Sequence, residues 1–539
     1  MLRLRTYSLS WRSVPMLKSL IKIRLGALTS GSGKKKGLGT AGIIALVSLL
    51  VLIFVFYFLV IADTLASVLI PLGYDAPYFA IFNILILSMV FLLSVFETKS
   101  ELFECKDNDL LLSMPIRPRD IVLARSLTVV ILNVIEALIV SIPVTVMYVV
   151  RGGNPLYIPS SIISAILIAL LATALSSAVG YLVALVSSRL KNSTAVTVLI
   201  SLAFIALYVV GYTSLMNGLT AMEDDPVAAG DAIGGAIGSL SVLGNISILK
   251  PIETSIFVVI SLASVLLAWF IISKNYVNII TTKAEGSKEK YVHRELVAGT
   301  ALIALAKKEL SLFFSNATYI LNGFIGAIFQ VMLVIMLMTS REDLLELAAM
   351  LGIFEGDGVF ELLITALLVG CGSISSISAS ALSLEGKSLW IIKSSPIKTT
   401  TVIAAKLVPH LAVCLPASLV SSVLAIIALG SHPGWWAFMI LVPVLSSFMF
   451  AMLGLALNIA MPKFEFASTA QVVKQSMPVF IITLGGMVFT VLAEALCFFG
   501  AMSLGAVLTA IIFSILVILG FLAAYLILSG PSVKRLEKL

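Results

Sequence analysis

Long apolar stretches separated by short polar segments run through nearly the whole chain. A helix needs about 20 apolar residues to cross roughly 30 Å of hydrocarbon, and twelve stretches are long enough. Strand-type alternation of polar and apolar residues is absent from the sequence. The pattern therefore predicts an all-α polytopic membrane protein with about twelve transmembrane helices. The expected spans are 38–63, 76–97, 123–150, 156–188, 194–215, 254–273, 316–338, 359–380, 401–429, 435–460, 477–498 and 504–529.

The composition excludes a set of soluble domains. Of the 539 residues, 60% are hydrophobic and only 12% are charged, whereas soluble proteins carry about 25% charged residues. Much of the surface must therefore face lipid. The net charge of +7 is typical of Lys/Arg-rich cytosolic loops, so we expect no nucleic-acid partner. The four cysteines lack disulfide or metal-ligand spacing, so we expect no metal site.

The positions of the Lys and Arg residues predict the orientation in the membrane. When the N-terminus is placed in the cytosol, 32 of the 35 Lys/Arg residues fall in or beside cytosolic segments. Shifting a single span would scramble this division. We therefore expect an even number of spans in the cell membrane, with both the N- and C-termini in the cytosol. The three exceptions are Arg151, Lys250 and Arg341.

One cytosolic loop occurs twice, with an offset of 281 residues. Residues 104–125, after the second span, read ECKDNDLLLSMPIRPRDIVLAR, and residues 385–406, after the eighth, read EGKSLWIIKSSPIKTTTVIAAK. Without gaps, the 22 positions include at least seven pairs of identical or like residues, which is more than chance explains in two loops. The matched pairs are Glu104/Glu385, Lys106/Lys387, Ser113/Ser394, Pro115/Pro396, Ile116/Ile397, Arg117/Lys398 and Arg125/Lys406.

A second repeated feature precedes each group of six spans. Residues 16–25 and 304–313 both set cations and apolar side chains at helical spacing, as in a helix lying in the inner headgroup plane. Six spans per half give both halves the same orientation, so we expect two parallel six-helix repeats. The expected domains are a cytosolic N-terminal segment with an interfacial helix (1–37), a first transmembrane half (38–273), a cytosolic linker with a second interfacial helix (274–315), a second transmembrane half (316–529) and a cytosolic tail (530–539).

The sequence of each copy of the loop predicts a short amphipathic helix that ends before a proline, Pro115 or Pro396. Such a helix beneath two spans, with its charged residues on the wet side, is suited to docking a cytosolic partner. A plain connecting loop is the alternative, and the duplication favours docking. The first loop carries more charges, whereas the second presents Leu389 and Trp390 as apolar anchors. We therefore expect salt-sensitive docking at the first loop and apolar docking at the second.

The motifs FECKDNDLLLSMPI at 103–116 and LEGKSLWIIKSSPI at 384–397 resemble those of permeases of type-2 ATP-binding-cassette (ABC) exporters. The resemblance implies a cytosolic coupling helix between the second and third spans of each half, here within 99–120 and 384–400. It also implies an interfacial elbow helix before each half; the matching segments are about 15–28 and 297–313.

The same resemblance implies a re-entrant outer hairpin before the sixth span, which would fall in the acidic and Gly-rich segment 216–252. A floppy extracellular loop is the alternative for this segment. In the second half only about five residues, 499–503, separate the last two spans, so any hairpin there is vestigial.

The resemblance further implies that the chain forms the translocation pathway of an ATP-driven exporter and docks two ABC ATPase subunits, identical or different. The segment 31–36 lacks the spacing of a phosphate loop, so we expect no enzyme activity and no cofactor in this chain. ATP and Mg²⁺ would bind the ATPase subunits, and lipids would surround the spans. The residues expected to couple to the ATPases are Glu104, Lys106, Asp107, Asp109, Pro115, Glu385, Lys387, Trp390 and Pro396.

Three polar residues within spans are candidates for the pathway. Glu136 in the third span and Glu494 in the eleventh are lone acids in apolar helices, where charge is expensive, and the repeat duplicates neither. His410 in the ninth span is the third candidate. For all three, a side chain that merely packs between helices is the alternative.

Other function classes stay open. A twelve-span secondary transporter of the major-facilitator kind also has parallel halves, but its Gly- and Arg-rich motif between the second and third spans is absent here. Proton coupling through Glu136 would be its signature. A membrane-embedded enzyme should show clustered His, Asp or Cys, which the sequence lacks. A non-transporting membrane scaffold is the third class. The apolar spans are compatible with lipids, peptides or drugs as substrates.

Overall fold

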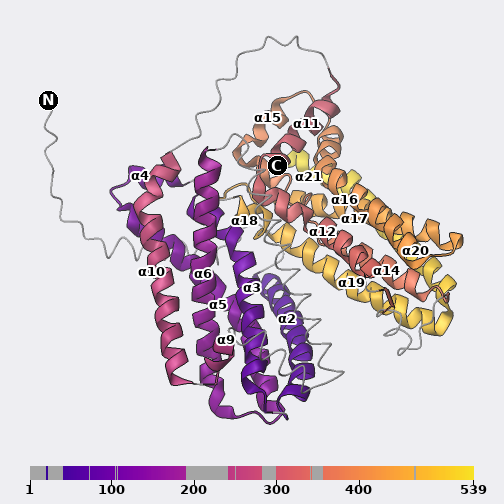
Figure 1. Ribbon diagram of the computed structural model, residues 1–539. Coiled ribbons are helices and arrows are strands. Elements are labelled where there is room, and N and C mark those ends of the chain that lie inside the picture. Colours follow the sequence, from indigo (N-terminus) through magenta and orange to yellow (C-terminus); the bar gives the residue numbers. More distant parts are fainter. Residues whose placement is uncertain are drawn as a thin grey trace, which may run out of the picture. The chain divides into compact units, whose positions relative to one another are not determined.

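In the computed structural model the chain forms two compact units, Met1–Glu289 and Lys290–Leu539. All secondary structure among the described residues is helical (Figure 1). The residues that the structure describes are 20–21, 40–71, 73–103, 105, 107–189, 241–248, 250–281, 299–339, 341–342, 356–466 and 469–539.

Five long helices dominate the described part of the first unit. In this unit α3 packs against α5 and α6, α2 packs against α5, and α10 packs against α6. Prolines start α5 and α10, because the fixed φ of proline suits a first helical turn. The helices are α2 (Thr40–Leu69), α3 (Asp75–Leu102), α4 (Asn108–Ser113), α5 (Pro118–Val150), η1 (Pro155–Tyr157), α6 (Ile158–Arg189), α9 (Ser241–Asn245) and α10 (Pro251–Thr281).

An aromatic core joins α3 to α5. The rings of Tyr78 and Phe79 on α3 pack with Tyr148 on α5, and the Tyr78 hydroxyl donates to the carbonyl oxygen of Val144 at 2.8 Å. At the end of the unit opposite α4, Arg151 pairs with Asp63 of α2, with Nε 2.6 Å from Oδ1. These contacts fix α2, α3 and α5 relative to one another.

The described part of the expected outer segment is folded into the first unit. Helix α9 packs against α3, where Asn83 donates to the carbonyl oxygen of Leu243 at 2.6 Å and to Ser247 Oγ at 2.9 Å. Asn83 lies about 12 Å along the axis of α3, so residues 241–248 enter the bundle. This favours the re-entrant interpretation for these residues; 216–240 lie outside the described residues.

Among its described residues, the second unit contains six apolar helices and several short ones. Helix α17 packs against α14, α16 and α20, while α12 packs against α14 and α16, and α11 lies along α16 (Figure 1). The helices are α11 (Ala301–Phe314), α12 (Ala317–Thr339), α14 (Val359–Ser373), η2 (Ser383–Ser388), α15 (Leu389–Ser394), α16 (Thr399–Leu429), α17 (Pro433–Ala460), α18 (Ala470–Val473), α19 (Met477–Leu504), α20 (Ala506–Ile527), η3 (Leu528–Ser532) and α21 (Val533–Lys538).

The interfacial helices expected before each half have different outcomes. The second, expected at about 297–313, is present as α11. Thr300 caps it by accepting a hydrogen bond from the backbone N–H of Ile303, and the helix buries Glu309 and Phe313 while exposing Leu302. The first, expected at about 15–28, lies outside the described residues except for Leu20 and Ile21.

The prediction that the eighth span runs to residue 380 is wrong. Helix α14 ends at Ser373, and turns follow to residue 382. Six of the residues 373–383 are serines, whose hydroxyls compete for backbone hydrogen bonds and disfavour a continued helix. All six serines are buried, so this non-helical stretch is covered by protein.

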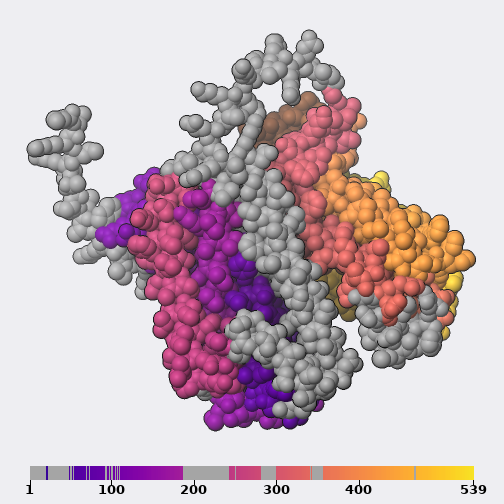
Figure 2. Space-filling view, in the orientation of Figure 1, coloured from indigo at the N-terminus to yellow at the C-terminus, as the bar shows by residue number. Residues whose placement is uncertain are grey.

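The described helices account for eleven of the twelve expected spans. Eight are long and apolar enough to cross a membrane, and three shorter apolar stretches lie in α2, α3 and α14. The fifth expected span, 194–215, lies outside the described residues. Only 17% of the apolar window of α10 is buried within the chain, and α10 forms one side of the first unit over its whole length (Figure 2). Such a helix is suited to lipid contact.

The close approach of α9 to α3 gives a first testable prediction. A Cβ at Gly244 would lie 2.0 Å from the carbonyl oxygen of Ala76, a backbone atom that cannot swing away. We expect Gly244→Ala to destabilise the first unit by about 1–3 kcal/mol, measured by thermal unfolding in detergent. Gly299→Ala, where the added methyl meets nothing within 4 Å, is the control and should leave the unfolding temperature unchanged.

Candidate functional site

The described parts of the duplicated loop form the same short helix in both units. Helices α4 and α15 each have six residues, and their first and last residues are both 281 apart. The long helices that follow, α5 and α16, also start 281 residues apart. The register of the loop repeat, inferred from seven matched pairs, is therefore the register of the folded structure.

Local hydrogen bonds repeat at the same offset. Ser113 Oγ donates to the carbonyl oxygen of Leu110 at 2.7 Å, and the equivalent Ser394 donates to that of Ile391 at 3.0 Å. After each proline, the backbone N–H of Ile116 or Ile397 donates to a carbonyl two residues back, at 2.7 and 2.8 Å. The matched residues thus specify one turn geometry twice.

In the first unit, Arg125 on α5 holds the loop from inside. Its side chain is 1% exposed, and Nη2 pairs with Asp107 Oδ1 at 2.7 Å. Its Nη1 donates to Asn108 Oδ1 at 2.6 Å and to the Tyr276 hydroxyl at 2.7 Å. A third bond from Nη1 reaches the carbonyl oxygen of Leu102 at 3.0 Å. The planar guanidinium thereby connects the loop, the end of α3 and the last helix of the unit, α10.

In the second unit, Lys406 occupies the position equivalent to Arg125. Its ammonium is also 1% exposed and contacts Glu385 Oε1 at 2.8 Å and Glu309 Oε1 at 3.0 Å. It donates in addition to the carbonyl oxygen of Ala381 at 3.1 Å. Lysine has three donors, and these three acceptors use them all.

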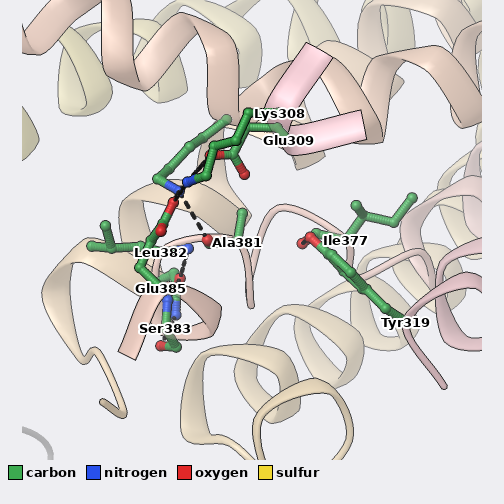
Figure 3. A network of polar contacts seen from close by, with 10 residues as sticks. Lys308, Glu309, Tyr319, Ile377, Ala381, Leu382, Ser383 and Glu385 are labelled. Atoms are coloured by element: carbon green, nitrogen blue, oxygen red, sulfur yellow. Dashed lines mark hydrogen bonds and ion pairs between the residues drawn. The ribbon is translucent and has the colours of Figure 1, made fainter. Parts of the chain in front are cut away.

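Lys308 of α11 closes this cluster into a ring of four charges. It pairs with Glu309 at 3.3 Å and with Glu385, so each lysine of the ring contacts both glutamates (Figure 3). We call Lys308, Glu309, Glu385 and Lys406 the charge ring. Because its net charge is zero and each carboxylate faces two ammonium groups, burial is tolerated. The charge ring joins the interfacial helix α11 to the loop.

Two members of the charge ring outside the spans have shifted pKa values. Burial acts to raise the pKa of Glu385, but Lys406 and Lys308 outweigh burial and hold this pKa below its ordinary value. For Lys308, burial acts to lower the pKa, and the carboxylates of Glu385 and Glu309 raise it above its ordinary value. Both shifts favour the charged forms.

Each short helix presents an apolar side chain to its surroundings at the same register. Leu110 is 58% exposed and the equivalent Ile391 is 52% exposed. Trp390, next to Ile391, is 67% exposed. The expectation that Leu389 is a second apolar anchor is wrong: Leu389 is buried, because it packs into the core of the second unit.

The sequence-predicted coupling residues divide into three groups. Pro115, Lys387, Trp390 and Pro396 are exposed on the loops. Glu385 and Asp107 instead turn toward the buried cations, so the expectation that they lie on the wet side of the helices is wrong. Each acid lies within hydrogen-bond distance of a cation on the following long helix, and pairing with it avoids leaving that buried charge without a partner. Glu104 and Lys106 lie outside the described residues, as does the side chain of Asp109 on α4.

The three candidate pathway residues lie on separate helices. Glu136 is partly buried on α5, Glu494 is partly buried on α19, and His410 is fully buried on α16. Neither ring nitrogen of His410 has a hydrogen-bond partner among the described residues. The described residues hold no group of three or more His, Cys, Asp or Glu side chains that could bind a metal ion. Glu136 belongs to the first unit, and the other two candidates belong to the second.

Sequence reasoning missed Glu309, Asn108 and Tyr276, which complete the two cation sites. A signal for Glu309 was present, because an acid on the otherwise apolar face of an amphipathic helix needs a buried partner. Asn108 and Tyr276 carry no comparable signal. Their role follows only from the fold, which brings α10 beside the first loop.

The C-terminal helix α21 lies beside the second loop. Thr399 at the start of α16 donates to Glu537 at 3.3 Å, and Arg535 donates to the carbonyl oxygen of Ala460 at 2.5 Å. Leu536 is buried and lines, together with Ile392 and its neighbours, a small cavity of about 190 Å³. The tail of the chain is thereby part of the surface around α15.

Removing Lys406, the fully buried cation of the charge ring, should strongly destabilise the second unit. We expect Lys406→Met to cost about 3 kcal/mol, because Glu309 and Glu385 are then buried with only the half-exposed Lys308 as partner. Lys387→Met, an exposed lysine of the same loop, is the control. Equal unfolding temperatures for the two variants would contradict a structural role for the ring.

The lowered pKa of Glu385 predicts a pH dependence. A carboxyl whose folded pKa is depressed stabilises the fold above its unfolded value, 4.5, and this stability is lost as pH falls through the lower, folded value. Hydrogen exchange of residues 384–398 should therefore accelerate below about pH 4.5 relative to α20. In Glu385→Gln, this acid-induced step should be absent. A step of equal size in both proteins would assign it to other groups.

Comparison with known proteins supports the membrane architecture. Residues 38–528 match a protein family described as membrane protein of 12 TMs. No curated protein and no solved structure matches the chain. The match extends over far more than half of the sequence and agrees with the eleven apolar helices among the described residues. The chain therefore belongs to this family of twelve-span integral membrane proteins.

Proposed function

We propose that this chain is the membrane-spanning permease of an ATP-driven ABC exporter, and that two separate ATPase subunits dock on the loops within 99–120 and 384–400. The observation that carries the proposal is the pair of six-residue helices α4 and α15, which share one register and one turn geometry. One loop of this kind could be a connector. Two copies that keep the same hydrogen bonds support two equivalent partner subunits.

The exposed residues of the loops support docking of a protein. Leu110 and Ile391 project at equivalent positions, and Trp390 adds a large aromatic surface. Exposed tryptophan and aliphatic side chains on a short, fixed helix are typical of interface anchors. The equivalent cations Arg117 and Lys398, both exposed, favour acidic groups at the rim of the partner's pocket.

The buried cations support the transmission of movement from such a partner. A docked subunit that displaces α4 would displace Arg125, and with it the ends of α3, α5 and α10. Displacing α15 would shift the charge ring and the helices α11 and α16 that carry it. Breaking either site leaves buried charge unpaired, so the loop and the helices are expected to move together.

The orientation belongs to the same proposal. The Lys/Arg distribution supports a cytosolic location for the loops and for both termini, in the cell membrane. ATP and Mg²⁺ would bind the partner subunits, on the side where both loops lie.

The proposal predicts that the chain purified alone does not hydrolyse ATP and that native membranes yield it with an ATPase. The chain is affinity-purified from its native membranes, the co-purifying ATPase is identified by mass spectrometry, and hydrolysis is measured with and without it. Two ATPase subunits per chain are expected. Hydrolysis by the chain alone, or wild-type chain that carries no ATPase, would refute the proposal.

Trp390 and Ile391 should contribute more to binding of the ATPase subunits than equally exposed side chains that face lipid. We expect the double variant Trp390→Ala/Ile391→Ala to lower ATPase recovery at least about tenfold, at low and high salt alike, because its contribution is apolar. Phe499→Ala, which removes an aromatic side chain of similar exposure from α19, is the control and should keep full recovery. Equal recovery for both would place the docking surface elsewhere.

A further inference from the structure

A non-helical segment of the second unit crosses what should be membrane depth. Helix α14 has 15 residues and is about 22 Å long, short of the roughly 30 Å of hydrocarbon. The chain continues through residues 374–382 without a regular helix, and the short helix η2 begins at Ser383. Backbone groups at this depth require cover by protein. We call residues 374–383 the link.

Two neighbouring helices approach the link and the end of α14 through glycines. A Cβ on Gly326 of α12 would lie 2.5 Å from both the carbonyl oxygen of Cys371 and Ser375 Oγ. A Cβ on Gly454 of α17 would lie 2.5 Å from Ser378 Oγ. Real Cβ atoms do not approach other atoms this closely, so a methyl group at either position requires the neighbouring atoms of α14 or the link to shift.

Helix α19 contributes a third glycine. A Cβ on Gly486 would lie 2.5 Å from the Oγ and 2.9 Å from the carbonyl oxygen of Ser373, where α14 ends. Gly485, one residue earlier on the same helix, is exposed and would meet nothing within 4 Å. Helices α12 and α17 thus pack closely against the link, and α19 packs closely against the end of α14.

Hydrogen bonds fix the link along its length. The Tyr319 hydroxyl donates to the carbonyl oxygen of Ile377 at 2.9 Å (Figure 3). At the loop end, Asn458 Oδ1 accepts from the backbone N–H of Leu382 at 2.7 Å and of Ser383 at 3.0 Å. The fully buried Asn458 therefore supplies the acceptor that a continuing helix would have supplied.

We propose that the link is a rigid positioning element that determines where the second loop stands, and that Gly326, Gly454 and Gly486 are its positioning residues. Ala381, near the end of the link, gives its carbonyl oxygen to Lys406 at 3.1 Å, so a displaced link displaces the charge ring and α15. In the first unit α3 runs unbroken to Leu102, and the loop there needs no such element. The use of this element in docking rests on the proposed function, whereas its rigidity does not.

The test compares Gly454→Ala with Gly485→Ala in the purified full chain. Both replace a glycine inside a helix by alanine, so the gain in helix propensity is the same, and only the first places a methyl against the link. We expect the amides of Leu382 and Ser383 to exchange hydrogen about tenfold faster in Gly454→Ala. Exchange in Gly485→Ala should equal that of the wild type.

A second variant separates displacement of the link from general misfolding. Ser378 Oγ has no hydrogen-bond partner among the described residues, and the next contact of the added methyl is the nitrogen of Ala379 at 3.2 Å. Adding Ser378→Ala to Gly454→Ala should therefore restore slow exchange, a non-additive result that marks direct coupling.

Three outcomes would overturn the proposal. The first is equal exchange rates in Gly454→Ala and Gly485→Ala. The second is faster exchange spread evenly over the second unit, including α20. The third is exchange that stays fast when Ser378→Ala is added to Gly454→Ala. ATPase recovery is measured in parallel. If the wild type recovers no ATPase but the exchange pattern is as expected, the docking function fails and the positioning link stands.

Discussion

A cation buried at the start of a long helix, Arg125 in one unit and Lys406 in the other, is the interaction on which the loops of this protein depend. A charge that is 1% exposed is costly to bury unless acceptors surround it, so the surrounding chain is constrained to bring acceptors to it. In the first unit a carboxylate, an amide, a phenol and a carbonyl meet this demand. In the second, two carboxylates and a carbonyl meet it.

The two solutions differ because the chemistry of the cation differs. Arginine spreads its donors over a plane and can reach neutral acceptors in several directions, whereas the ammonium of lysine is a compact charge that favours carboxylates around it. The second carboxylate, Glu309, comes from the interfacial helix α11, so a surface helix is tied to the interior of the second unit. The equivalent position of the repeat is Leu28, an apolar residue outside the described part of the chain.

Much of this architecture could be predicted from the sequence, and the boundary between success and failure has a physical basis. The spans follow from hydropathy, and the register of α4 and α15 follows from Ser, Pro and Ile residues whose hydrogen bonds are local. The partners of the cations could not be predicted, because Glu309 and Tyr276 lie 97 and 151 residues away from them. The end of α14 was missed for another reason. Averaged hydropathy rates the Ile- and Ser-rich stretch after Ser373 as apolar enough for a membrane span. It does not include the hydrogen bonds that serine hydroxyls form with nearby backbone groups, which compete with helix formation.

The order in which the two cation sites can close during synthesis follows from the same sequence separations. Glu309, Ala381 and Glu385 all precede Lys406, so the charge ring can close as soon as the start of α16 has been made. Arg125 is different, because Tyr276 is made 151 residues later, near the end of α10. Until Tyr276 has been made, Arg125 has Asp107 and Asn108 as partners but lacks the hydroxyl of Tyr276. The first half of the protein therefore becomes complete only when its last helix has entered the membrane, while the second half can build its loop in chain order.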